Sequence, residues 1–109
     1  MAIKTKISFF QGEDVKVQVT VTGENITGWT LAFAVATAYG ATPLFTKTTV
    51  SGITISNGAG GVFDVAIADT DTDALASGGY VWEAKRTDAG QETVLAYGDL
   101  ELKPRVVAT

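Results

Sequence analysis

Residues 52–90 read GITISNGAGGVFDVAIADTDTDALASGGYVWEAKRTDAG, and this stretch decides the fold. A short apolar segment runs into the tight-turn pair Asn57-Gly58, which is a strong hairpin signal. The segment at 61–68 then alternates, with Phe63, Val65 and Ile67 on one side. Together these features predict two antiparallel strands joined by a hairpin.

An acidic corner and a further strand complete this stretch. Residues 69–77 are rich in Asp and Thr, which predicts a corner with at most one short helical turn capped by an Asp or Thr side chain. Residues 80–87 alternate again, with Tyr80, Trp82 and Ala84 on one side. Asp88-Ala89-Gly90 reads as the turn of a second hairpin, whose last strand covers residues 92–103.

The strands before this stretch follow the same period of two. At 14–22, Val15, Val17, Val19 and Val21 share one face, which is typical of a half-buried strand. At 29–38 the large side chains are expected to point into the core, namely Trp29, Leu31, Phe33 and Val35. Shorter strands are expected at 5–10, 43–50 and 53–56.

We therefore predict an all-β protein, a single Ig-like antiparallel β-sandwich of about seven to eight strands. The 109 residues suit one domain, residues 1–109, with short terminal extensions at about 1–4 and 104–109. Turns recur every 8–12 residues or so, and no segment has a long helical pattern.

The composition excludes several function classes. The chain has no Cys and no His, so it has neither a thiolate metal site nor a conventional Ser-His triad. Eight basic and twelve acidic residues give a net charge of −4, which disfavours binding to nucleic acid. No apolar run approaches a membrane span or a signal-peptide core. We predict a non-enzymatic protein with no cofactor, made and assembled in a cytoplasm.

The acidic corner admits a calcium hypothesis. Asp69, Asp71 and Asp73 alternate like the first ligands of an EF-hand loop, but Ala74 and Tyr80 stand where that loop needs Gly and Glu. A different calcium site remains an alternative to a solvated, self-capping corner. Because the sequence does not decide between a calcium site and a self-capping corner, we assign no metal ligand.

The residues before the next strand suggest a structural latch. Asp73 followed by Gly78, Gly79 and Tyr80 resembles the tyrosine corner of sandwich domains. In that arrangement a Tyr near the start of a strand donates a hydrogen bond to the backbone of the preceding corner. We therefore assign these four residues to a structural corner.

Two apolar features are candidates for an interface. Ala32, Ala34 and Ala36 form an uncharged strip that is unusual for a solvent face, and it is expected either to pack on another subunit or to be buried within this one. Val106 and Val107 lie in the C-terminal tail, which either frays or adds to the sheet edge of a neighbour.

The chain resembles a family of small phage and prophage Ig-like proteins, of the type found as the N-terminal domain of baseplate upper proteins. The similarity covers nearly the whole sequence. In the first half Phe9 to Asp14 matches a Phe-x-x-Gly-Asp opening with Glu13 inserted, and residues 26–33 match a Thr-Gly-x-x-x-x-Phe strand. In the second half it is carried by Lys47-Thr48, Gly-Ile-Thr-Ile at 52–55, Gly-Val-x-x-Val at 61–65, Asp71-Thr72, Leu75, Gly78 to Tyr80 and the hairpin at 88–102.

The resemblance implies a bacteriophage virion structural protein, synthesised in the host bacterial cytoplasm. It would act as capsid decoration or cement, or as a neck, tail or baseplate accessory. Its partners would be other virion proteins and further copies of itself. The alternative is a carbohydrate-binding or host-adhesion module of a phage fibre or spike, with Tyr39, Tyr97 or Trp29 contacting the sugar. A cellular Ig-like domain, similar only by convergence, is a third hypothesis.

Overall fold

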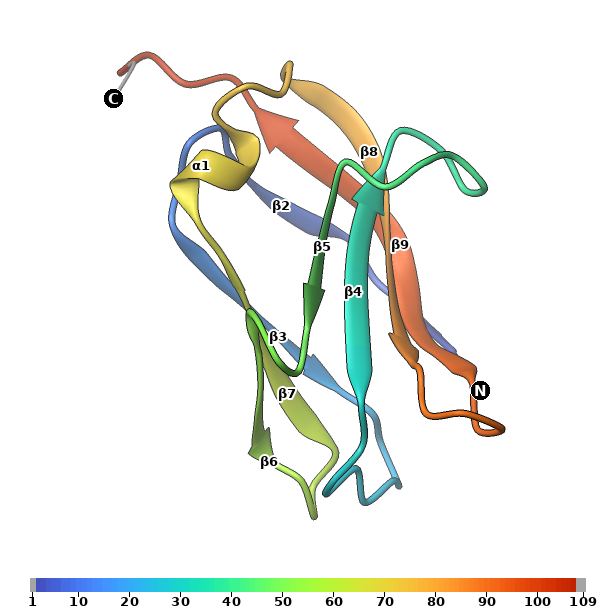
Figure 1. Cartoon of the computed structure of the whole chain (residues 1–109). Helices are drawn as coiled ribbons and strands as arrows, with labels where there is room; N and C mark the ends of the chain where they lie inside the picture. Colours follow the sequence, from blue (N-terminus) through green and yellow to red (C-terminus); the bar gives the residue numbers. More distant parts are fainter. Residues whose placement is uncertain (1, 108–109) are drawn as a thin grey trace.

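The computed structural model describes residues 2–107 as two packed β-sheets with one helical turn (Figure 1). Its strands are β1 (Ile3–Lys4), β2 (Ile7–Phe10), β3 (Val15–Thr20), β4 (Leu31–Ala36), β5 (Phe45–Thr48), β6 (Ile53–Asn57), β7 (Val62–Ile67), β8 (Gly78–Arg86) and β9 (Thr93–Lys103). The helical turn α1 (Asp69–Thr72) lies between β7 and β8. No helix within residues 2–107 has the length and apolar character needed to cross a membrane.

The strand order is that of an Ig-like sandwich. The larger sheet has the order β1-β9-β8-β4-β5, with β2 also paired with β9, and the smaller sheet has the order β3-β7-β6. In an Ig domain likewise the second, fifth and fourth strands face a sheet built from the third, sixth and seventh. The predictions of an all-β sandwich and of one short helical turn near 69–77 are confirmed.

The N-terminal strands differ from the antiparallel expectation. β1 and β2 both pair with β9 in parallel, and residues 3 and 4, expected in a terminal extension, form β1. The link between them passes close to β9 at Gly98, where a Cβ atom would collide with the carbonyl oxygen of Thr5. Because Gly98 has no side chain, Thr5 approaches closely enough for its N–H to reach the Tyr97 carbonyl at 2.9 Å.

The core lies between the sheets and follows the predicted alternation. Trp82, Phe33 and Phe63 are the largest fully buried side chains, and the rings of Phe33 and Trp82 stack at 5.6 Å. The prediction that Trp29 points into the core is only partly right. Trp29 precedes β4, in a turn where Gly28 has a φ of 79°, and its half-buried ring packs against the edge of the core.

The acidic corner is held by hydrogen bonds to both neighbouring segments. Asp71 Oδ2 accepts the Ala68 N–H at 2.8 Å and Asp14 Oδ1 accepts the Asp69 N–H at 2.7 Å, so carboxylates cap the N-terminus of α1 as predicted. The buried hydroxyl of Thr72 accepts the Gly12 N–H at 2.9 Å. The corner therefore fixes the turn between β2 and β3.

Candidate interaction surface

The predicted alanine strip lies on the outer face of the larger sheet. In β4 the side chains alternate strictly, so Leu31, Phe33 and Val35 are buried while Ala32, Ala34 and Ala36 are half-buried on the opposite side. Cross-strand neighbours on that side include Thr46 of β5 and Glu83 of β8, both opposite Ala34. The strip is thus a flat band of small side chains between two polar strands, and part of it is open to contact.

A tyrosine from the following loop extends across this face. The Tyr39 hydroxyl donates a hydrogen bond to the Gly98 carbonyl of β9 at 3.1 Å, and its ring meets Tyr97 edge-on at 6.2 Å. Desolvation of the hydroxyl, followed by the nearby Asp99 carboxylate, raises the pKa of Tyr39 above its usual value. The loop is therefore attached to the sheet, while Tyr39 keeps 54% of its surface exposed.

A hollow of about 120 Å³ lies between the loop and the strip. Ala34 and Ala36 line it together with Val81, Pro43 and the Tyr39 ring. Tyrosine is one of the residue types that are enriched in the central parts of protein interfaces. We call Ala32, Ala34, Ala36, Tyr39 and Tyr97 the alanine–tyrosine face.

The two predicted interface residues of the tail do not join this face. Val106 and Val107 are 99% and 70% exposed, and the chain that carries them leaves the body beside α1 (Figure 1). Arg105 holds that exit, because its guanidinium pairs with Asp73 and its N–H bonds to Gln11 Oε1 at 3.2 Å. The structure therefore places the two candidate interfaces on different parts of the molecule.

The structural corner has the predicted hydrogen bond. The Tyr80 hydroxyl donates to the Ala76 carbonyl at 2.6 Å, which is the bond of a tyrosine corner. Gly78 has a φ of 140°, a conformation that favours glycine. Asp73, which was assigned to the same corner, pairs with Arg105.

The three aspartates of the corner serve separate contacts. Asp71 pairs with Lys47, Asp73 pairs with Arg105, and Asp69 accepts the N–H of Thr70. Within residues 2–107 no three acidic side chains converge in a group that could hold a metal ion. The contacts favour the self-capping corner over the calcium alternative.

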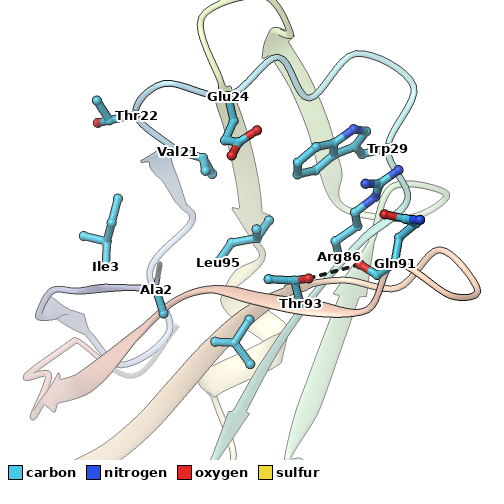
Figure 2. A pocket seen from close by; sticks show the side chains of 11 residues that line it. Ala2, Ile3, Val21, Thr22, Glu24, Trp29, Arg86, Gln91, Thr93 and Leu95 are labelled. Atoms are coloured by element: carbon cyan, nitrogen blue, oxygen red, sulfur yellow. Dashed lines mark hydrogen bonds between the residues drawn. The ribbon is translucent and has the colours of Figure 1, made fainter.

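Trp29 belongs to a second hollow, of about 480 Å³, at one end of the sandwich (Figure 2). Val21 and Leu95 form an apolar floor, while Glu24, Gln91 and Thr93 supply polar groups around it. The Arg86 guanidinium lies 4.1 Å from the centre of the Trp29 ring. This is a concave mixture of apolar and polar groups, of the kind that binds small ligands.

Arg86 is the residue of this hollow that the sequence did not reveal. Its Nε donates to Asp88 Oδ2 at 2.8 Å, and the Thr30 N–H donates to the same carboxylate at 3.0 Å. The antiparallel pairing of Leu31 with Arg86 places this cluster beside Trp29. Alternation of side chains within one strand does not tell which residues of two neighbouring strands lie side by side. The sequence therefore could not predict that Arg86 lies beside Trp29.

Comparison with known proteins adds no relative, since neither the models of protein families nor the curated proteins give a match to this chain.

Proposed function

We propose that the protein is a non-enzymatic structural component of a bacteriophage virion that acts through protein–protein interfaces. It serves as decoration or cement on the capsid, or as an accessory of the neck, tail or baseplate. The motif resemblance described above motivates the phage assignment. The observation that carries the mode of action is the alanine–tyrosine face, a band of small uncharged side chains and tyrosines beside Glu83 and Lys85 of β8.

The alanine–tyrosine face loses little side-chain entropy when another protein covers it. Alanine has no side-chain entropy to lose, and a tyrosine already bonded to the sheet loses less than a free one. Covering the strip removes apolar area from water and leaves no charged group of β4 unpaired. A virion protein with a complementary apolar surface would therefore bind here at a small cost in side-chain entropy.

The test is co-sedimentation with particles of the phage or prophage whose genome encodes the chain. Purified protein is expected to bind particles that lack it. Ala34→Lys is expected to abolish binding, because it places a charge at the centre of the strip. Ala66→Lys is the matched control, since Ala66 is an exposed alanine on β7 of the other sheet. Equal binding by both variants would exclude this face, and protein that never binds particles would exclude the function.

The hollow beside Trp29 supports a second candidate function, carbohydrate binding. An indole ring with neighbouring carboxylate, amide and hydroxyl groups matches the stacking and hydrogen-bonding needs of a sugar. A glycan array is expected to give hits that Trp29→Ala removes and Tyr97→Ala, on the other face, retains. An array without hits would exclude this function and leave the first untouched.

A further inference from the structure

β3 is one of the two edge strands of the smaller sheet, and no strand among residues 2–107 pairs with its outer side. β3 pairs with β7 on one side, from Val15–Ile67 to Thr20–Val62. The N-terminal strands, which precede β3, pair with β9 of the other sheet. β3 is therefore an edge along its whole length.

The alternation of hydrogen bonds between β3 and β7 shows which backbone groups of β3 are free. The Val21 N–H bonds to the Gly61 carbonyl at 2.7 Å, in line with the β3–β7 ladder. Hydrogen-bonded and non-hydrogen-bonded positions alternate in an antiparallel pair, so the valines of β3 bond to β7. The N–H and C=O groups of Lys16, Gln18 and Thr20 consequently point away from it.

The other edges carry several features that oppose pairing, whereas on β3 the one such feature is the exposed Lys16. β5 has only four residues and an inward-pointing charge, Lys47. β6 has a register shift between Ile55 and Asn57, and the N-terminal edge is interrupted between β1 and β2. Short strands, inward charges and bulges are the usual protection against edge-to-edge association. β3 pairs without any register shift over six residues.

Apolar surface lies directly beside this edge. A groove of about 400 Å³ runs along β3 and is lined by Ile3, Ile7, Val17, Val19 and Ala96. Val17 faces inward yet is only half-buried, and Ile3 on the opposite wall is 37% exposed. An added strand would satisfy the free backbone groups and cover this apolar surface together.

We infer that the occupant is β3 of a second copy, paired antiparallel about a two-fold axis at Gln18. In this register Gln18 faces Gln18 of the second copy, and Lys16 faces Thr20. All the free backbone groups then find partners, because these are the positions whose N–H and C=O point outward. Registers that place Lys16 opposite Lys16 set like charges face to face, which destabilises a cross-strand pair.

The side chains on the inward face of β3 are also well paired in this register. Val17 lies opposite Val19 of the second copy, so the half-buried valine gains an apolar neighbour in place of water. The contact is isologous, as in most homodimers, and forms one continuous sheet across both copies. This inference is independent of the proposed function, since it concerns the smaller sheet and needs no virion.

The experiment uses the full chain alone, in sedimentation velocity over a range of concentrations. The wild-type protein is expected to form a dimer. Gln18→Lys and Gln18→Glu each place like charges on the axis and are expected to raise the dimer dissociation constant about fivefold or more. An equimolar mixture of the two variants is expected to restore the dimer, because opposite charges then meet at the axis.

Thr54→Lys is the matched control. Thr54 and Gln18 both lie opposite Asp64 on the smaller sheet, but Thr54 belongs to β6 at the other edge. This variant is expected to dimerise like the wild type. A dimer that survives both Gln18 variants, or that Thr54→Lys weakens equally, would overturn the β3 contact.

Amide hydrogen exchange gives a readout that needs no variant. The Lys16, Gln18 and Thr20 amides have no acceptor among residues 2–107, and are expected to become protected as the protein concentration rises. Rapid exchange of these amides at every concentration would overturn the inference. So would protection that appears only when virion proteins are added, because the edge would then take another partner.

Discussion

Lys47 and Asp71 form an ion pair of 2.7 Å that joins the edge strand β5 to the helical turn α1. Both side chains are mostly buried, with 17% and 18% of their surfaces exposed. The Asp71 carboxylate also accepts the Ala68 N–H at 2.8 Å. One carboxylate thus ties the edge strand β5 to α1 and caps the helical turn between β7 and β8.

Replacing Asp71 with Ala is therefore expected to lower the free energy of unfolding by about 1–3 kcal/mol. The change leaves the Lys47 ammonium and the Ala68 N–H without their partner in a partly buried place. Urea unfolding followed by circular dichroism measures the effect. Lys6→Met is the control, since the Lys6–Glu101 pair is 62% and 49% exposed and such pairs contribute about 0–1 kcal/mol. Equal losses of stability in Asp71→Ala and Lys6→Met would contradict a structural role for the buried pair.

Gly98 is expected to tolerate no side chain. A Cβ atom there would collide with the backbone of Thr5, whose carbonyl also accepts the Trp82 Nε1–H at 3.1 Å. Gly98→Ala must displace the link between β1 and β2, and such overpacking lowers the free energy of unfolding by about 1–3 kcal/mol. Thermal unfolding measures the change.

Gly79→Ala is the control for that substitution. Gly79 lies on the neighbouring strand β8, and a Cβ atom added there meets nothing within 4 Å. Its stability is expected to stay within about 0.5 kcal/mol of the wild type. A similar loss of stability in both variants would mean that the close approach of Thr5 to Gly98 is not the cause.

The pH dependence of stability is expected to involve Asp88. The hydrogen bond from the Arg86 side chain, followed by that from the Thr30 N–H, holds the pKa of the Asp88 carboxyl below its usual value. A lowered folded pKa stabilises the fold above the unfolded value of about 4, and this contribution disappears as the pH falls through the folded pKa.

The wild type should accordingly exceed Asp88→Asn in stability at neutral pH, and the difference should shrink as the pH falls below about 4. Urea unfolding at a series of pH values tests this. Glu92→Gln removes a negative charge from the same hairpin and controls for net charge. A difference that grows on acidification would contradict the assignment.

How much the sequence predicts depends on whether a feature is local. The inward set Phe63, Val65 and Ile67 follows from alternation within one strand, and the corner from turn residues beside Tyr80. The parallel pairing of β1 and β2 depends on a contact between Thr5 and Gly98, 93 positions apart, which no local pattern encodes. The Trp29–Arg86 hollow and the position of Tyr39 over β9 likewise depend on which strands are neighbours.

The tyrosine corner gives the last prediction. Tyr80→Phe removes the 2.6 Å hydrogen bond to the Ala76 carbonyl but keeps the half-buried ring against the core. A single hydrogen bond contributes about 0.5–1.5 kcal/mol, so the free energy of unfolding should fall by that amount. Tyr97→Phe, on the outer face of β9, is the control and should change stability by less than about 0.5 kcal/mol. Faster amide exchange at 76–80 in Tyr80→Phe, and not in Tyr97→Phe, would locate the loss at the corner. Unchanged stability in both would mean that the ring packing alone holds the corner in place.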